Sequence, residues 1–470
     1  FPWKKWLTLH GNKSSSCDHK KIKLLQNNAD SSLKGVILKC EDCQTEASLG
    51  KIFERDAFEG FQCSGRHPHL GSNFNPETCN EKVKPLLKGA SNSYFPVHES
   101  LISIPPFQDW FTEMLGRMDI QDLFKKTDYE VQIILEGLML NQGKDVEEHK
   151  EYYFEQYKLR KKWYQDNEED YIFQEYLRLK ENYEEEEMDS FSRDFEKEML
   201  VPPVGLNGYV DTLAKITKLK EVKALLGFKR ISEPASSSNP GKGRFAPLSR
   251  NLFNYWYPAI EIFGEGIFFT INEELLNKWE NNDVLSKRAS KINKLHEQHT
   301  RENLPPWRES SFELDPIITP RFLMLHSLSH AFMNQLAFDC GYAVASLKER
   351  LYVSDLSSKP MAGILIYTSA SDSEGTLGSL SENANPDIFE FTLKQALKNI
   401  EICSHDPNCI DEVSSLTEPF NHAACDSCLI LPENCCVHFN KFLDRQTLVG
   451  DNFSEDSSTK IEGFFSELID

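Results

Sequence analysis

The segments CSHDPNC at residues 403–409 and NHAACDSCLILPENCCVHFNKFLDR at residues 421–445 contain six of the twelve cysteines of this 470-residue chain. Cys425 and Cys428 form a C-x-x-C pair, whose tight turn directs two thiolates at one point. One edge of a tetrahedral Zn²⁺ site requires this geometry. Cys409 and Cys436 complete a set of four, which predicts a closed structural zinc site without an open position for substrate.

The same stretch holds further ligand types. Cys403 and Cys435 are spare sulfurs, and His422 and His438 are alternate ligands of lower rank. A disulfide cluster and a group of inert buried thiols are the competing interpretations.

A second set of cysteines lies near the N-terminus. Cys40 and Cys43 follow the apolar, strand-like run GVILKC, and Cys63 and Cys79 come at distances that a zinc ribbon tolerates. These four predict a second Cys₄ site, so we expect about two structural zinc ions per chain. Cys17 with His19 is an alternative source of one ligand.

Composition limits the class of protein. The net charge is −21 with a sequence pI near 5.2, which argues against non-specific nucleic-acid binding by the whole surface and leaves room for a local basic groove. The sequence has no run of eighteen apolar residues, so we expect no membrane span. C-x-x-C pairs in a long chain are typical of metal sites in a reducing cytoplasm, and we expect a cytoplasmic protein.

Three parts are expected within a mixed α/β (α+β) fold. Residues 1–105 predict a module like a zinc ribbon, residues 106–235 a charged helical region, and residues 236–470 an α/β domain with the Cys₄ site. In the middle part, aromatic residues recur on otherwise charged helices between Tyr152 and Trp163.

The segment YVDTLAKITKLKEVKALLGFKRI at residues 209–231 has apolar residues three and four apart, which predicts an amphipathic helix ending at Gly227. Its polar side would be the most basic surface of the chain and the best candidate for contact with DNA or an acidic partner. The residues of that candidate contact are Lys215, Lys218, Lys223, Lys229 and Arg230. Next, NYWYPAIEIFGEGIFFTINEELLNKWE predicts two strands around residues 264–266 and then a helix.

The segment PRFLMLHSLSHAFMNQLAF at residues 320–338 predicts a buried helix with His326 and His330 on one face. Two histidines four apart can hold a metal ion. A zincin needs a glutamate after the first histidine, however, and Ser327 stands there, so hydrogen-bonded core histidines are the favoured interpretation. A possible functional core would combine this pair with Glu349, Arg350 and Asp372.

The segment at residues 361–380, MAGILIYTSASDSEGTLGSL, predicts a strand followed by a polar loop, and a helix follows at residues 388–402. This β-loop-α unit delivers Cys403 and Cys409 to the cysteine cluster. The cluster therefore belongs to the edge of an α/β domain. The sequence contains no G-x-x-x-x-G-K-[ST], so no NTPase motor and no complete catalytic constellation are expected.

These segments together resemble the DrmB family of the DISARM phage-defence system. The resemblance is carried by FPW at residues 1–3, LLKGASNSYFP, LKEVKALLGFKRI, WYPAIEIFGEGIFF, PRFLMLHSLSHAF, GYAVASLKERLY, MAGILIYTSASDSEGTLGSL, CSHDPNC and AACDSCLILPENCC through NKFLDR. The C-terminal part is similar to the zinc-binding domain behind the motor of MrfA-like helicases. Two positions depart from the expected pattern, Ser379 in place of a glycine and Asp426 in place of a histidine.

The resemblance implies a non-motor subunit that forms a heterodimer with a DrmA-like helicase and helps it to engage foreign DNA. It also implies that a leading segment precedes Phe1 in such proteins. Two other hypotheses stay open from the residues alone. One is a metal-dependent hydrolase or nuclease built on His326, His330, Glu349 and Asp372, and the other is an autonomous DNA-binding module.

Overall fold

The computed structural model describes two compact units. Unit 1 comprises Phe1–Val97, Leu226–Pro234 and Gly243–Tyr257, and unit 2 comprises His98–Leu225, Ala235–Lys242 and Pro258–Asp470, which differs from the expected three-part division. The described residues are 1–13, 16–27, 29–54, 56–63, 65, 68–71, 83–87, 90, 93–103, 120–141, 143, 145–165, 168–181, 195–230, 245–249, 257–302, 314, 316–341, 343–368, 379–410, 420–451 and 460–469. Among them, no helix has the length and apolar character to cross a bilayer.

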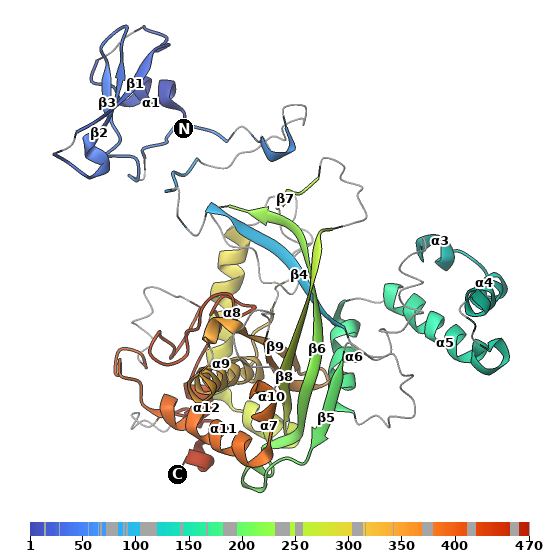
Figure 1. Cartoon of the computed structure of the whole chain (residues 1–470). Helices are drawn as coiled ribbons and strands as arrows, with labels where there is room; N and C mark the ends of the chain where they lie inside the picture. Colours follow the sequence, from blue (N-terminus) through green and yellow to red (C-terminus); the bar gives the residue numbers. More distant parts are fainter. Residues whose placement is uncertain are drawn as a thin grey trace. The chain divides into compact units, whose positions relative to one another are not determined.

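Unit 1 is built on a small antiparallel sheet with the order β1 (Ile22–Gln26), β2 (Val36–Cys40) and β3 (Glu46–Ser48) (Figure 1). The strand predicted before Cys40 is therefore confirmed. Helix α1 (Trp3–His10) buries Trp6 and Leu7 against Leu38 and Ala47 of the sheet. Cys40 lies in the same buried cluster, so a cysteine of the predicted metal site is part of this core.

Unit 2 is organised around a sheet with strand order β4-β6-β8-β10-β9, in which β5 also pairs antiparallel with β6, whereas β7 pairs with the end of β6 that belongs to unit 1 (Figure 1). The strands are β4 (Phe95–Ser103), β5 (Glu196–Leu200), β6 (Val210–Lys229), β7 (Ala246–Pro247), β8 (Ala259–Ile271), β9 (Leu347–Ser354) and β10 (Met361–Thr368). All eight residues of β10 are buried, because both faces of the sheet are covered. Ile364 packs into the larger core on one face, and Leu365 packs with Tyr176 of helix α6 on the other.

The long apolar helix of unit 2 is α9 (Pro320–Cys340), which confirms the predicted buried helix. The Thr319 side chain accepts a hydrogen bond from the N–H of Phe322 and caps its start, and Pro320 at the first position suits the missing amide hydrogen. Gly341 ends it with φ = 71°, a left-handed conformation that glycine adopts without steric cost. Buried residues occur on every side of α9, as expected for a helix surrounded by protein.

Unit 2 contains ten other α-helices among the described residues. They are α3 (Ile120–Phe124), α4 (Asp128–Asn141), α5 (Val146–Gln165), α6 (Glu168–Lys180), α7 (Glu273–Glu280), α8 (Asp283–Glu302), α10 (Ser379–Glu382), α11 (Pro386–Glu401), α12 (Gln446–Val449) and α13 (Ser466–Ile469). Tyr153 and Tyr157 of α5 pack with Val131 and Leu135 of α4, as the aromatic recurrence suggested. The mixture of helices and strands confirms the fold class, and β10 followed by α11 confirms the β-loop-α unit.

The predicted amphipathic helix at residues 209–231 is wrong, because these residues form the long strand β6. The register of β6 against β8 shifts once between Val210 and Thr212 and again between Ile216 and Leu219. Each shift places one extra residue in β6, which reverses the alternation of its side chains beyond that point. Val210 and Leu213 therefore share one face, and Ile216 and Leu219 share the other. Two bulges thus produce an apolar spacing of three that resembles a helical period. The predicted helical region therefore ends before β5.

The two strands predicted around residues 264–266 are one continuous strand, β8. Gly264 and Gly266 are needed for close approach: a Cβ atom there would lie 2.2 Å from the carbonyl oxygen of Thr368 and 2.6 Å from that of Ile366. The helix predicted after them is confirmed as α7, with Asn272 as its N-cap.

Candidate metal centres

The C-terminal cysteine group consists of Cys403, Cys409, Cys425 and Cys428, whose sulfur atoms all lie within 4.8 Å of one another. The Sγ–Sγ distance is 3.4 Å between Cys403 and Cys425, and 3.8 Å for both the Cys409–Cys428 and the Cys425–Cys428 pairs. A tetrahedral zinc ion with Zn–S bonds of about 2.3 Å separates its sulfurs by about 3.8 Å. The group therefore has the donor set and the size of a Cys₄ zinc site.

Local turns position these sulfurs. Cys403 follows directly on α11, and Cys425 and Cys428 share a turn in which the N–H of Cys428 donates to the carbonyl of Cys425 at 3.1 Å. Backbone N–H groups also point at sulfur, from His405 to Cys403 at 3.4 Å and from Cys425 to Cys428 at 3.3 Å. Such hydrogen bonds stabilise thiolates and hold the ligands in orientation.

The fully buried side chain of Arg445 lies next to the site and offsets part of its charge. Its Nη1 donates to the carbonyls of Ile400 and Glu401 at 3.0 Å each, at the end of α11, and its Nη2 pairs with Asp406. The hydrogen bond from Cys428 lowers the pKa of Cys409 to about 6, and the Arg445 guanidinium acts in the same direction. Because four thiolates around Zn²⁺ carry a net charge of −2, a neighbouring cation stabilises the filled site.

The structure corrects the membership of the predicted C-terminal set: Cys403 takes the place of Cys436. Cys436 is buried elsewhere, beside the histidines of α9. The chain turns away after Cys428, and Asn440 fixes this turn by bonding both the N–H and the carbonyl of Leu431. The other spare sulfur, Cys435, donates to the carbonyl of Val344 at 3.2 Å. His422 and His438 lie outside this group as well.

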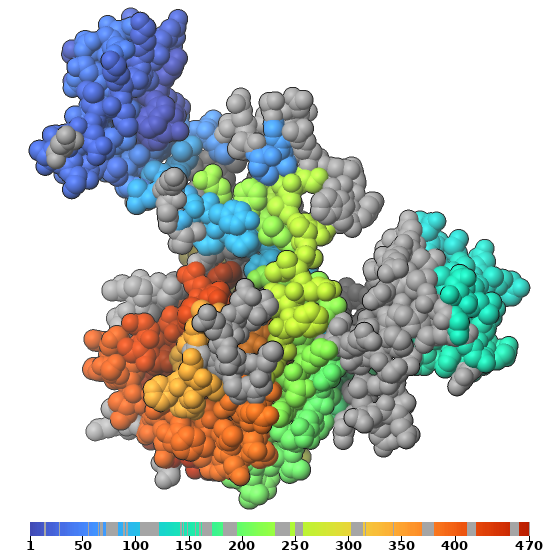
Figure 2. Space-filling model, viewed as in Figure 1, coloured from blue at the N-terminus to red at the C-terminus, as the bar shows by residue number. Residues whose placement is uncertain are grey.

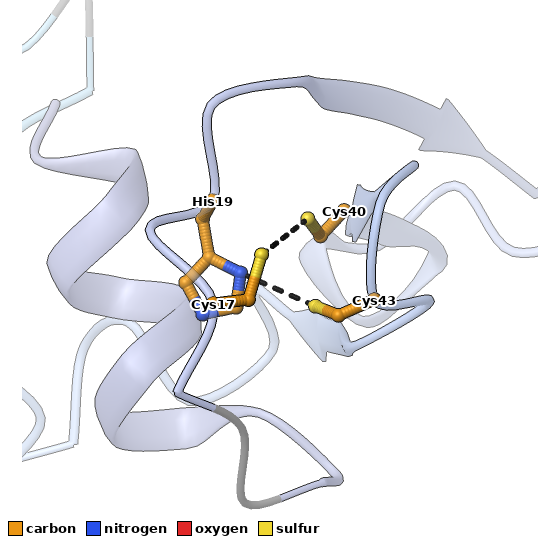
Figure 3. A group of neighbouring side chains, drawn as sticks. All are labelled: Cys17, His19, Cys40 and Cys43. Carbon is orange, nitrogen blue, oxygen red and sulfur yellow. Dashed lines mark hydrogen bonds between the residues drawn. The ribbon is translucent and has the colours of Figure 1, made fainter.

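The N-terminal group consists of Cys17, His19, Cys40 and Cys43 (Figure 3). The sulfurs of Cys17 and Cys40 are 3.9 Å apart, and Nδ1 of His19 is 3.5 Å from the sulfur of Cys43. These lengths suit a tetrahedral Cys₃His zinc site. The predicted partner Cys63 is exposed and outside the group, and Cys79 lies outside the described residues.

In this group, Cys17 and His19 take the places predicted for Cys63 and Cys79. From the sequence, Cys17 with His19 was expected to replace one ligand at most. The signal was present as C-x-H at residues 17–19, and β1 and β2 bring it to the C-x-x-C turn because Ile22 pairs with Cys40.

A third group combines His326, His330, Glu349 and Cys436. It includes three of the five residues predicted as a possible functional core and adds Cys436. Arg350 follows Glu349 on β9 and therefore points to the opposite face, where Nη2 donates to Glu175 at 3.0 Å. Asp372 lies outside the described residues.

Four of the five basic residues predicted as a contact surface lie along β6, and Arg230 directly follows this strand, so the five do not form a helix face. Lys215 forms an ion pair with Glu382 of α10. Figure 2 shows the green surface of β5 and β6 next to the orange surface of the C-terminal segments. Lys218 is opposite Glu196 in β5, and Arg230 donates to the carbonyl of Ser93 at 3.0 Å. Burial lowers the pKa of Lys223 and of Lys229.

Comparison with known proteins identifies two domains in this chain. Residues 1–95 match a domain of unknown function, DUF8724, and residues 328–429 match the MrfA Zn-binding domain. The second match contains all four cysteines of the C-terminal group, and it agrees with structural zinc in this chain. The chain is also 32% identical over 484 aligned residues to the DISARM protein DrmB of Bacillus paralicheniformis, covering 100% of this chain and 80% of that protein.

This chain belongs to the DISARM DrmB family. The alignment with DrmB covers the whole chain and therefore both units. In this DrmB-family chain, the four cysteines of the C-terminal group lie within the matched zinc-binding domain, whereas His326 and Cys436 of the third group lie outside the matched residues.

Proposed function

We propose that this chain is a non-motor accessory subunit of a DISARM anti-phage complex, which binds a DrmA-like helicase and assists its engagement of foreign DNA. The observation that carries this proposal is the 32% identity to a DISARM protein DrmB along the full chain. The cysteine groups support it, because closed four-ligand sites stabilise structure and leave no position for substrate.

The binding surface for the helicase is proposed to depend on the C-terminal cysteine group. That group ties the end of α11 to the segment at residues 420–445, which Arg445 and Asn440 hold in place by hydrogen bonds. A subunit interface needs a preformed surface, because ordering flexible loops on binding costs free energy.

The DNA contact is proposed to lie on α8, since four of the five basic residues predicted as a contact surface are half-buried. Lys287, Lys291 and Lys294 are exposed and spaced four and three apart, so they share one face of the helix. Ala289 and Ile292 fix the opposite face in a buried cluster. A rigid strip of three cations suits a phosphate backbone, despite the acidic balance of the chain.

Co-expression with a DrmA-like helicase tests the main proposal. Affinity purification through a tag on the helicase should retain this chain through size-exclusion chromatography. Separate elution of two folded proteins would contradict the proposal.

The DNA contact is tested on the purified complex by fluorescence anisotropy with an overhang-containing duplex. Changing Lys287, Lys291 and Lys294 to Glu should weaken binding and lower the slope of log K against log salt by roughly 2–3, since each lost phosphate contact removes about 0.9. The charge-matched control changes the exposed Lys125, Lys126 and Lys158 to Glu. Equal loss in both variants would show a general charge effect and remove α8 from the proposal.

A further inference from the structure

The buried group of His326, His330, Glu349 and Cys436 is not used by the proposed function. His326 and His330 are 0% exposed, Glu349 is 2% exposed and Cys436 is 5% exposed. The Nε2 atom of His326 lies 3.1 Å from the sulfur of Cys436 and 3.2 Å from Oε1 of Glu349. Nε2 of His330 lies 3.5 Å from the same carboxylate oxygen. Four zinc-ligand atoms thus converge on one small volume inside the protein.

Hydrogen bonds from the surroundings direct both histidines toward that volume. Nδ1 of His326 is 3.2 Å from the carbonyl oxygen of Phe442, and Nδ1 of His330 is 2.8 Å from that of Leu429. A carbonyl oxygen only accepts, so each Nδ1 carries the proton and donates. Each neutral ring then presents the lone pair of Nε2 to the centre of the group. This is the arrangement that metal-binding histidines show in proteins.

The other two side chains are oriented in the same way. The hydroxyl of Ser329 donates to Oε2 of Glu349, so that Oε1 faces the histidines. The backbone N–H groups of His438 and Asn440 donate to the sulfur of Cys436 at 3.3 and 3.4 Å. These two amides hold the sulfur in orientation, as outer hydrogen bonds do for metal ligands.

Two buried atoms of the group have no hydrogen-bond partner in the described structure: Nε2 of His330 and Oε1 of Glu349. An unsatisfied buried polar atom costs about 1–3 kcal/mol, and more if it is charged. These two atoms belong to the same group and lie 3.5 Å apart, so one bound cation would satisfy both.

We propose that His326, His330, Glu349 and Cys436 bind a third Zn²⁺ ion. Zinc accepts imidazole nitrogen, carboxylate oxygen and thiolate sulfur in a tetrahedral set, with bonds of about 2.0–2.3 Å. Such bonds place neighbouring N and O ligands about 3.3 Å apart, close to the observed separations. One carboxylate and one thiolate neutralise the 2+ charge, which suits a fully buried position.

This ion is structural. Four protein ligands close its coordination shell, and burial of all four leaves no route for a substrate, whereas a catalytic zinc keeps one open position. It joins α9, β9 and the segment after Cys428, because its ligands come from all three. The carbonyl of Leu429, next to Cys428 of the Cys₄ group, bonds to His330 and links the two sites.

Zinc content of the full chain tests this inference without any assay of DISARM function. Inductively coupled plasma mass spectrometry of protein expressed with added zinc should find three zinc ions per chain. Cys436→Ser should lower this to two. Cys435→Ser is the matched control, because Cys435 is the adjacent buried thiol and lies outside the group. It should keep three.

Two zinc ions in the wild-type chain, or three in Cys436→Ser, would overturn the proposal, and a third metal other than zinc would overturn the choice of metal. Zinc X-ray absorption of the wild-type chain needs no variant and covers a failure of Cys436→Ser to fold. Three filled sites supply eight sulfur ligands over three zinc ions, against seven over two if this group holds none. An average that corresponds to seven sulfur ligands over two zinc ions would also overturn the proposal of a third zinc ion.

Discussion

The small sheet of unit 1 and the large sheet of unit 2 are stabilised in different ways. In unit 1, eight apolar residues form the described buried cluster, and one of them, Cys40, is also a ligand of the Cys₃His group. In unit 2, β10 is buried along its whole length between two clusters, and the metal groups lie beside α9 and α11. A small domain buries too little apolar surface to be stable alone, so a metal ion has to supply the difference.

Zinc binding therefore contributes a larger share of the folding free energy in unit 1 than in unit 2. Removal of zinc should abolish the fold of the N-terminal sheet, but it should leave the seven-stranded sheet intact and loosen only the segments tied to the metal. Each prediction below changes one side of this contrast.

The largest effect is expected in unit 1 for Cys43→Ser. Loss of one ligand removes zinc binding, and for small metal-dependent domains that binding free energy, about 10–16 kcal/mol, is the folding free energy. We expect amide hydrogens of β1 to β3 to exchange at the rate of an unfolded chain, while β10 stays protected. Hydrogen exchange with mass spectrometry measures both in one sample. The exposed Cys63 provides the control, and Cys63→Ser should leave exchange unchanged.

The second effect concerns Cys428→Ser in the C-terminal group. We expect a loss of at least about 4 kcal/mol in the free energy of unfolding of the segment at residues 403–445, because the substitution removes a metal ligand. Binding to the helicase should be lost with it, whereas protection of β8 and β10 should persist. Loss of protection throughout the sheet would mean that the metal, and not the apolar core, holds unit 2 together.

A third prediction tests the apolar side of the contrast. Phe332 on α9 is fully buried and packs against the rings of Phe269 and Phe389. Phe332→Ala should lower the free energy of unfolding of unit 2 by about 3–5 kcal/mol through the cavity that it leaves. Zinc content should stay that of the wild-type chain. Urea unfolding followed together with zinc release checks both points.

Sequence spacing predicted Cys409 and the two pairs of ligands that local turns join. Cys425 with Cys428, and Cys40 with Cys43, lie three residues apart, and a turn alone brings their sulfurs together. The remaining ligands depend on tertiary contacts. Cys436 was excluded from the Cys₄ group by the path of the chain after Cys428, which Asn440 determines through hydrogen bonds that spacing does not encode.

The helix and strand assignments show the same limit. The buried helix α9 was predictable because its apolar residues, its start at Pro320 and its end at Gly341 all agree. Strand β6 was not, because two bulges alter its side-chain period, and bulges are set by the pairing with β8. The possible functional core predicted from the sequence included His326, His330 and Glu349, but it lacked Cys436, which comes from a distant segment and was predicted as a ligand of the Cys₄ group.

The smallest effect is expected for Glu221→Gln, which tests a group of buried polar contacts in unit 2 that involves no metal ligand. The buried Glu221 carboxylate on β6 contacts the hydroxyl of Ser100, Nζ of Lys348 at 2.9 Å and the hydroxyl of Tyr367 at 3.2 Å. Burial raises its pKa, but the attraction of Lys348 and the hydrogen bond from Ser100 outweigh burial and lower the pKa below 4.5. The substitution keeps the shape but leaves Lys348 unpaired, so we expect a loss of about 2–3 kcal/mol at neutral pH.

The pH dependence gives this prediction its sign. Because the folded-state pKa of Glu221 is lowered, the unfolded state binds the proton more readily, and its contribution is complete above about pH 4.5 and lost as the pH falls through the folded-state value. The difference in free energy of unfolding between wild type and Glu221→Gln should therefore shrink below pH 4.5. Urea titrations of both proteins after zinc chelation isolate this carboxylate from the acid release of metal. A difference that stays constant with pH would show that the charge of Glu221 contributes nothing, and that the sheet of unit 2 depends on apolar burial alone.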